Sequence, residues 1–428
     1  MKTKYLFLFV LFIVQLSGAT ETQPHTIQKL ETFSKVLGYL EQNYIDSINP
    51  EKLVEQAIKG MVSELDPHTT YLTKDEYEQM RVDTSGKFGG IGIELGMNEN
   101  KELIVIKPME TGPAIHKGVK EGDRILEVNG ESTKGWSIID AVQKLRGPNG
   151  STVKLKLIHE TETESFDVEL RRTTIYIKSV SHKVLLNEYG YIQVKSFQEN
   201  TDRDVENAFY KLKKDIEQKK RTMKGLILDL RNNPGGLLDQ AVKVTDLFVD
   251  HGIIVSTKGR SGTQVDVSYA KKEGTLPELP MVTLINDGTA SASEIVAGAL
   301  QDHLRSTLIG TPSFGKGSVQ TIIDLEDGSG LKMTVARYYT PSDRPIQNMG
   351  NQPDLYVSYF NYRPEDEYFR RESDLEGSID TVEIDNKSHK RKGTGTEKIL
   401  DPQLKASLEY LKTVDRMGSS KKSTNEKK

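Results

Sequence analysis

A serine and a lysine in this 428-residue chain lie in two short segments rich in small residues, and together they suggest nucleophilic catalysis. Ser291 stands in TASASE, where a helix is predicted to begin, and Lys316 lies in the later loop FGKGSVQ. A serine hydroxyl is a poor nucleophile until a neighbouring base takes its proton, and Ser-Lys pairs are one recurring solution. The two residues therefore predict a peptidase in which Ser291 attacks and Lys316 is the base.

The lysine must be uncharged to act as a base. An ordinary lysine has a pKa near 10.4, so deprotonating it at pH 7 costs about 4 to 5 kcal/mol. Burial disfavours the ammonium form, so we expect Lys316 in a mostly dry pocket without a carboxylate partner. Gln320 is neutral and can orient the amine without stabilising its charge. Because four residues of a straight strand span roughly 13 Å, the arrangement requires a bend at Gly317.

Other interpretations of these residues stay open. Ser291 and Glu294 also form the S-x-x-E capping box that begins many helices, so Glu294 is interpreted as a helix-start residue. Ser293 lies only two residues from Ser291 and is a competing nucleophile. A histidine base is disfavoured, because His303 lies over three turns along the same predicted helix, at about 1.5 Å per residue. His68 belongs to the N-terminal helical region.

Acyl transfer also needs donors for the oxyanion, commonly two backbone amides. The N–H of Ala292 is one candidate, because it directly follows the serine at a helix start. The second is expected from the turn Pro234-Gly235-Gly236. The sequence does not decide between the two glycines, and we take Gly236 as the candidate.

The elements that position these residues alternate between strands and helices from about residue 175 onwards, which predicts an α/β core with a largely parallel sheet. The predicted strands are Tyr191 to Val194, Gly225 to Leu230, Met281 to Ile285 and Ser318 to Leu325. The predicted helices are Asp202 to Glu217, Leu238 to Phe248 and Ser293 to Gln301. The site is expected at the carboxyl ends of the strands.

A β-rich module of about ninety residues precedes the core, with short β-branched runs separated by glycines and one helix from Ser137 to Leu145. Its loop Gly90-Ile91-Gly92-Ile93 leaves backbone amides free to bind a carboxylate. By itself so short a pattern is better interpreted as a tight turn and a buried strand than as a binding loop. Arg146, at the end of the module's helix, is interpreted either as a contact to the core or as part of a solvated turn.

The N-terminal region combines an export signal with a helical arm. Lys2 and Lys4 precede an apolar run and a small-residue site ending at Ala19, which is typical of a signal peptide, although an uncleaved anchor stays open. Apolar residues then recur at helical spacing to about Met80. This arm exposes an apolar stripe unless it packs elsewhere, so we interpret it as a dimerisation or docking arm and predict a homo-oligomer. Export to the bacterial periplasm or cell envelope follows from the signal, with membrane proximity if it stays uncleaved.

Composition excludes several classes of protein. The formal net charge is −4 and no basic patch is interleaved with aromatics, so nucleic acid is not an expected partner. There is no cysteine, which excludes a thiol catalyst and disulfides. The eight histidines show no metal-ligand spacing, so we expect neither a metal nor another cofactor.

The sequence resembles two known families. The stretch from Gly112 to Gly130, GPAIHKGVKEGDRILEVNG, resembles a PDZ domain, and the resemblance makes the loop from Gly90 to Ile93 its carboxylate-binding loop. The segments DLRNNPGG, TASASE and FGKGSVQ resemble the carboxyl-terminal processing peptidases of the tail-specific protease family, from about Phe33 to Tyr356. That resemblance implies a crotonase- or Clp-like α/β core with Ser291 as nucleophile, Lys316 as base and Gln320 as the residue orienting the lysine.

The resulting prediction is an exported serine endopeptidase that recognises proteins or peptides with apolar free C-termini. The alternative is a PDZ scaffold with an inactive hydrolase-like core. The predicted organisation is a signal peptide at 1–19, a helical arm at 25–84, an inserted β-rich PDZ domain at 85–172, an α/β core at 173–360, and a charged, largely disordered tail at 361–428 with a short helix at 401–411.

Overall fold

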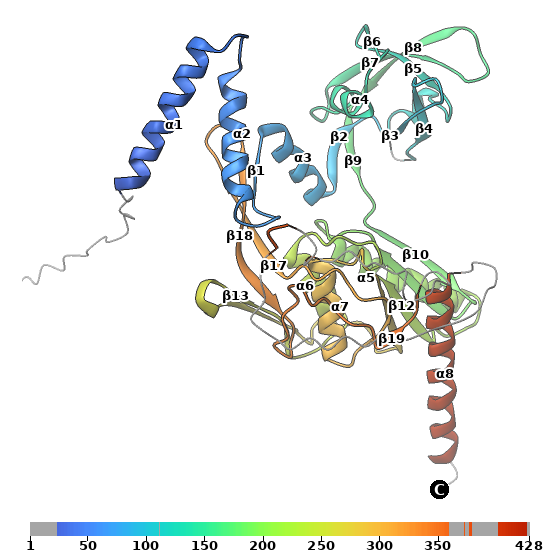
Figure 1. Cartoon of the computed structure of the whole chain (residues 1–428). Coiled ribbons are helices and arrows are strands. Elements are labelled where there is room, and N and C mark those ends of the chain that lie inside the picture. The colour runs from blue at the N-terminus through green and yellow to red at the C-terminus, as the bar shows by residue number, and fades with distance from the viewer. Residues whose placement is uncertain (1–23, 111, 359–371, 373–375, 379–400, 426–428) are drawn as a thin grey trace, which may run out of the picture. The chain divides into compact units, whose positions relative to one another are not determined.

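The computed structural model describes residues 24–110, 112–358, 372, 376–378 and 401–425 (Figure 1). The predicted signal peptide and most of the predicted disordered tail lie outside these residues. The chain divides into two compact units, one ending at Met61 and one beginning at Val62. No helix in the described part is long and apolar enough to cross a membrane.

The first unit holds helix α1 (Pro24–Asn43) and most of α2 (Pro50–Ser63). Pro50 occupies the first turn of α2, where its missing N–H costs no helical hydrogen bond. The predicted apolar stripe is exposed: large side chains along α1 lie on its surface. They are Ile27, Leu30, Phe33, Val36, Tyr39 and Leu40.

The core of the second unit is a six-stranded sheet in the order β10-β11-β12-β15-β16-β19. Its strands are β10 (Val180–Leu185), β11 (Tyr189–Val194), β12 (Gly225–Asp229), β15 (Met281–Ile285), β16 (Thr307–Gly310) and β19 (Leu355–Tyr356). Only β10 runs antiparallel to its neighbour, and the other pairs are parallel. The predicted α/β core with a largely parallel sheet is confirmed.

Both faces of this sheet are covered because its strands are apolar on both sides. Side chains such as Leu226 and Leu228 pack with helices α5 (Thr201–Gln218), α6 (Leu238–Asp246) and α7 (Ala292–Asp302). Ile227, between them on β12, points to the other face and packs with α8 (Pro402–Asn425). Helix α8 begins after Asp401, as the sequence predicts, and continues beyond the predicted end at Leu411.

A second, antiparallel sheet carries the lysine loop. Its strands are β1 (Thr70–Leu72), β18 (Gly330–Tyr339), β13 (Ile253–Lys258) and β14 (Gln264–Tyr269), and β17 (Ser318–Asp324) also pairs with β18. The 3₁₀ turn η2 (Arg260–Gly262) connects β13 and β14. The sequence pattern assigned β17 to the alternation of the parallel sheet, and that prediction is wrong. A hairpin with β18 satisfies its backbone without a helical crossover.

The β-rich module enters and leaves through one ribbon, in which β2 (Lys87–Gly90) pairs antiparallel with β9 (Thr173–Tyr176). Helix α3 (Lys74–Ser85) precedes the ribbon. The module's sheet runs β3 (Ile93–Met97), β4 (Leu103–Pro108), β5 (Arg124–Val128), β7 (Thr152–Ile158), β8 (Ser165–Arg171), with β6 (Glu131–Ser132) beside β5. The turn η1 (Ile115–Lys117) and helix α4 (Ile138–Leu145) complete it. A separate apolar core makes the module a domain of its own.

Candidate active site

Ser291 lies at the start of α7, in the connection that leaves the carboxyl end of β15. Its φ of 56° and ψ of −118° are unusual for a residue with a side chain, and its surface is only 8% exposed. The connection is held from the neighbouring strand end: the Ala290 N–H donates to the Asn233 carbonyl at 3.0 Å, and the Thr289 hydroxyl donates to the Leu230 carbonyl at 2.8 Å. The structure thus holds this serine in a strained conformation that its surroundings impose.

Glu294 connects the serine turn to the lysine loop. Its Oε2 accepts the backbone N–H of Ser291 at 2.8 Å and the backbone N–H of Lys316 at 2.8 Å. Its Oε1 accepts the N–H of Gly315 at 2.7 Å and the Ser313 hydroxyl at 2.6 Å. Because both backbone nitrogens lie 2.8 Å from Oε2, the nitrogens of Ser291 and Lys316 are separated by at most twice that distance. The two predicted catalytic residues are brought together although 25 positions separate them in the sequence.

The Glu294 carboxyl is completely buried, and burial raises its pKa to about 7 while the four hydrogen bonds oppose that rise. The predicted capping box is present, so the helix-start interpretation of this residue is correct. That interpretation is incomplete, because the Glu294 carboxylate also accepts a hydrogen bond from the loop that carries Lys316.

Lys316 has the lowered pKa that a base requires. Burial, with a smaller contribution from the nearby Lys332, lowers the pKa of its amine to about 8, against the opposing effect of Glu372, Glu294 and Asp66. Within the described residues, Lys316 forms no ion pair. The lysine is thus largely desolvated, with carboxylates close enough to affect it but none paired with it.

Gln320 lies on β17, next to an irregularity of the β17–β18 ladder between Val319 and Gln320. Its amide nitrogen donates to the Ser318 hydroxyl at 2.8 Å and the Thr334 hydroxyl at 3.4 Å. Among the described residues it makes no hydrogen bond to Lys316, so its predicted orienting role stays a prediction. Gly315, just before Lys316, has a left-handed φ of 96°, and the expected bend at Gly317 stays a prediction.

The turn after β12 lies against the serine. A Cβ on Gly235 would come within 2.8 Å of the Ser291 Cβ. The Gly235 N–H is occupied, because it donates to the Asn233 side chain at 2.9 Å. In the part of the chain that the structure describes, the Gly236 N–H has no acceptor, and neither has the N–H of Ala292 as the first residue of α7. These two free donors are the pair taken from the sequence.

His303 and His68 are each engaged with another group, and the partner of His68, Glu372, also acts on the charge of Lys316. His303 ends α7 at the opposite terminus from Ser291, and its Nε2 lies 2.7 Å from the Ile253 carbonyl. His68 pairs with Glu372 at 2.5 Å. The described residues contain no cluster of side chains that could hold a metal ion.

In the β-rich domain, β3 is an edge strand and α4 packs against it. Gly90 ends β2, and Ile93 begins β3 and is half-buried. Gly92, between them, has a φ of 72°, and a Cβ there would come within 2.4 Å of the Gly112 Cα, so only glycine fits. The Ile91 side chain is 2% exposed and belongs to the domain's own core. Ile91 can therefore contact a ligand through its backbone alone.

Several residues near the site were missed by the sequence analysis. Lys332 on β18 and Asp66 both affect the charge of Lys316. Asp66 accepts the backbone N–H of Thr69 at 2.9 Å and the hydroxyl of Thr334 at 3.1 Å, and Thr334 accepts from Gln320. In the sequence Asp66 precedes Pro67, a pair that indicates only a break in the chain's helical pattern.

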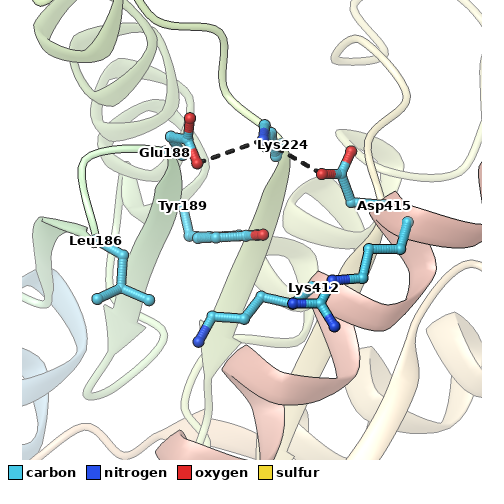
Figure 2. A pocket seen from close by; sticks show the side chains of 7 residues that line it. Leu186, Glu188, Tyr189, Lys224, Lys412 and Asp415 are labelled. Atoms are coloured by element: carbon cyan, nitrogen blue, oxygen red, sulfur yellow. Dashed lines mark ion pairs between the residues drawn. The ribbon is translucent and has the colours of Figure 1, made fainter. Parts of the chain in front are cut away.

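A pocket of about 310 Å³ lies away from these residues, between the turn after β10 and helix α8 (Figure 2). Lys224 there stands between Glu188 and Asp415 and pairs with both, at 3.4 and 3.3 Å. None of the predicted site residues lines this pocket. Its lining carries three basic side chains (Lys224, Lys412 and Arg416) and two acidic ones (Glu188 and Asp415).

Fold and site together define a serine peptidase with an inserted peptide-binding domain, and comparisons with known proteins agree. Residues 188–357 match the model of peptidase family S41, residues 79–158 that of the PDZ domain, and residues 13–76 that of the activating protease CtpB N-terminal domain. The chain belongs to peptidase family S41, among its carboxy-terminal processing proteases.

Relatives named for that activity cover most of the chain. The carboxy-terminal-processing protease of Bartonella bacilliformis is 42% identical over 349 residues, which cover 81% of this chain and 79% of that protein. The carboxy-terminal processing protease CtpA of Bacillus subtilis is 36% identical, over 78% of this chain and 70% of that protein. A solved structure of the photosystem II D1 C-terminal processing protease is 31% identical and covers 77% of this chain and 92% of that chain, with a TM-score of 0.44.

Proposed function

We propose that this peptidase cleaves its substrates with a Ser291–Lys316 dyad. The observation that carries the proposal is the single Glu294 oxygen that accepts the backbone N–H groups of both residues, which places the serine turn beside a lysine with a lowered pKa. The neutral Lys316 amine takes the hydroxyl proton as Ser291 Oγ attacks the peptide carbonyl. The lysine then gives that proton to the leaving amine, and water hydrolyses the acyl-enzyme.

The oxyanion of each tetrahedral intermediate accepts hydrogen bonds from the N–H groups of Gly236 and Ala292. Both donors lack another acceptor among the described residues, and the second stands at the positive end of the α7 dipole. Preorganised donors of this kind are worth about 3 to 4 kcal/mol each in the transition state. Gly235 is less suitable, since its N–H already donates to Asn233.

Gln320 orients Lys316 without charging it. Its amide nitrogen is used by two hydroxyls, which leaves its amide oxygen to accept from the lysine once substrate is bound. The pair closes only after a side-chain rotation, because the structure shows no such bond.

The substrate is a protein or peptide captured by its C-terminus. The unpaired edge of β3 accepts the tail as an added strand, while the N–H groups of the loop from Gly90 to Ile93 bind its carboxylate. The apolar last side chain of the tail lies beside Ile93. A substrate with an amidated C-terminus should therefore be cleaved much more slowly, and equal turnover of the two forms would exclude this mode of capture.

The cleavage assay tests the dyad directly. A tailed protein substrate should yield fragments with the wild type and none with Ser291→Ala or Lys316→Ala. Ser293→Ala is the matched control, because it removes a neighbouring hydroxyl whose hydrogen bond to the Asn233 carbonyl is worth only about 1 kcal/mol. Tail binding without any fragments from the wild type would favour the inactive scaffold instead.

Two further features complete the proposal. The exposed apolar side chains of α1 join copies of the chain, which light scattering on a variant with Leu30 and Phe33 changed to serine would detect as a smaller mass. The protein is exported by its N-terminal signal, and cell fractionation should recover it from the envelope. Recovery from the cytoplasm would contradict that assignment.

A further inference from the structure

Arg231 carries a buried ion-pair network at the carboxyl end of β12. Its guanidinium, 10% exposed, donates to both Asp229 oxygens at 2.6 to 3.1 Å. It also donates to both oxygens of Asp401, at 3.0 and 2.8 Å, and to the Gln403 amide oxygen at 2.9 Å. Asp401 and Gln403 lie 170 and 172 positions farther along the chain, so the guanidinium joins the core to the start of α8.

Asp401 has two partners at once. Besides the two-pronged pair with Arg231, its Oδ1 accepts the N–H of Leu404 at 3.0 Å and so caps α8. Arg231 holds the pKa of Asp401 below its usual range, with the helix-cap bonds acting the same way and burial opposing them. Gln403 is 1% exposed, and its nitrogen donates to the Val357 carbonyl at 2.8 Å. These contacts fix the first turn of α8 at one place on the sheet.

The same arginine opens the turn that supplies the oxyanion donor. Its backbone N–H donates to Asp229 at 3.0 Å, and the next residue, Asn232, has a φ of 56° with its N–H on the Asn286 side chain. Asn233 then holds the turn to the serine connection through the Ala290 N–H. The Arg231 guanidinium, held by Asp229 on one side and Asp401 on the other, therefore constrains the first residue of the turn 231–236. The last residue of that turn is Gly236.

We propose that Asp401 and Gln403 of the C-terminal helix are positioning residues for peptide cleavage: by holding Arg231, they set the turn that presents the Gly236 N–H to the oxyanion. This inference rests on the proposed function of that N–H. The C-terminal helix thereby belongs to the catalytic apparatus without touching the substrate.

The test compares two substitutions on the same helix. Asp401→Asn keeps the helix cap, because asparagine is an equally good capping residue, and removes the charge that faces Arg231. Asp415→Asn removes the partner of Lys224 at the surface pocket shown in Figure 2. For both variants, made in the full-length chain, we would measure kcat, KM, the melting temperature and the affinity for a peptide aldehyde. The adduct of the aldehyde with Ser291 carries an oxyanion that accepts from the same Gly236 and Ala292 N–H groups.

Asp401→Asn should lower kcat about tenfold, part of the loss expected for removing an oxyanion donor outright, and should weaken aldehyde binding by a similar factor with KM within about twofold. Asp415→Asn should change none of these. An unchanged kcat in Asp401→Asn overturns the proposal, as does a lower kcat with unchanged aldehyde affinity. Should Asp401→Asn fail to fold, Gln403→Met removes one acceptor of the Arg231 guanidinium, together with the hydrogen bond to the Val357 carbonyl, and must show the same paired losses.

The outcome is separable from that of the proposed function. Loss of cleavage in Ser291→Ala supports the dyad whatever Asp401→Asn does. Wild-type levels of cleavage in Ser291→Ala would refute the dyad without reference to α8.

Discussion

Raising the pH from 7 to 9 should accelerate cleavage by a definite factor, because the rate depends on the uncharged fraction of Lys316. With the pKa of that lysine at about 8, about one tenth of the enzyme carries a neutral amine at pH 7 and about nine tenths at pH 9. The rate should therefore rise about tenfold and level off near pH 9. A lysine at its ordinary pKa would give about a hundredfold rise over the same interval and no plateau.

Protonation of Glu294 should make the cleavage rate fall more steeply as the pH is lowered below 7. Its pKa of about 7 means that it takes up a proton just below neutrality. A protonated carboxyl accepts fewer hydrogen bonds, so the joint between the serine turn and the lysine loop weakens. The slope of log kcat/KM against pH should change from about 1 between pH 7 and 8 to about 2 below pH 7.

The assay is steady-state cleavage of a soluble tailed peptide from pH 5.5 to 10, with circular dichroism at each pH to exclude unfolding. Lys332→Met provides the matched variant: it removes the cation that lowers the Lys316 pKa, so its inflection should move to higher pH while the plateau stays near that of the wild type. A single inflection near 6.5, as for a histidine base, or a rate still rising at pH 10 would refute the reasoning.

Three other expectations concern stability and cleavage. The Lys316 pKa is lower in the folded chain than in the unfolded chain, so its protonation below pH 8 opposes folding. Lys316→Met should therefore raise the free energy of unfolding at pH 7 by up to about 3 kcal/mol, as measured by chemical denaturation. This gain should disappear above pH 10.5. Gly236→Ala places a Cβ within 2.2 Å of the Phe197 carbonyl oxygen and should abolish cleavage, whereas Gly130→Ala, with a positive φ but open space, should leave cleavage intact. Leu411→Ala should cost about 2 to 5 kcal/mol because that side chain is fully buried, while exposed Met417→Ala should stay within about 0.5 kcal/mol; equal effects would contradict the described docking of α8.

The elements of the core were predictable because local periodicity decides them. The helix predicted from Asp202 to Glu217 is α5 (Thr201–Gln218), and the strand predicted from Met281 to Ile285 is β15 with those bounds. Apolar residues recur every three to four positions in the first and occupy every position of the second except Thr283, so neighbouring residues suffice to recognise them.

Contacts between distant segments were not predictable in the same way. Nothing near Arg231 in the sequence points to Asp401, because their pairing follows from where α8 lies on the finished sheet. Ser318–Asp324 reads as a strand in either sheet, and only the hairpin with β18 decides between them. Glu294 shows its capping role locally, but its contact with the lysine loop requires the fold.

The β2–β9 ribbon carries both chain crossings between the PDZ domain and the peptidase core. Gly90 and Thr173 are directly opposite each other in that ribbon, so residues 91–172 begin and end at two adjacent backbone positions. Deleting 91–172 and closing the gap with a two-residue hairpin turn would leave the ribbon's pairing intact. During evolution a different binding domain could therefore replace this one, and so change the proteins that are cleaved, without disturbing the proposed catalytic residues.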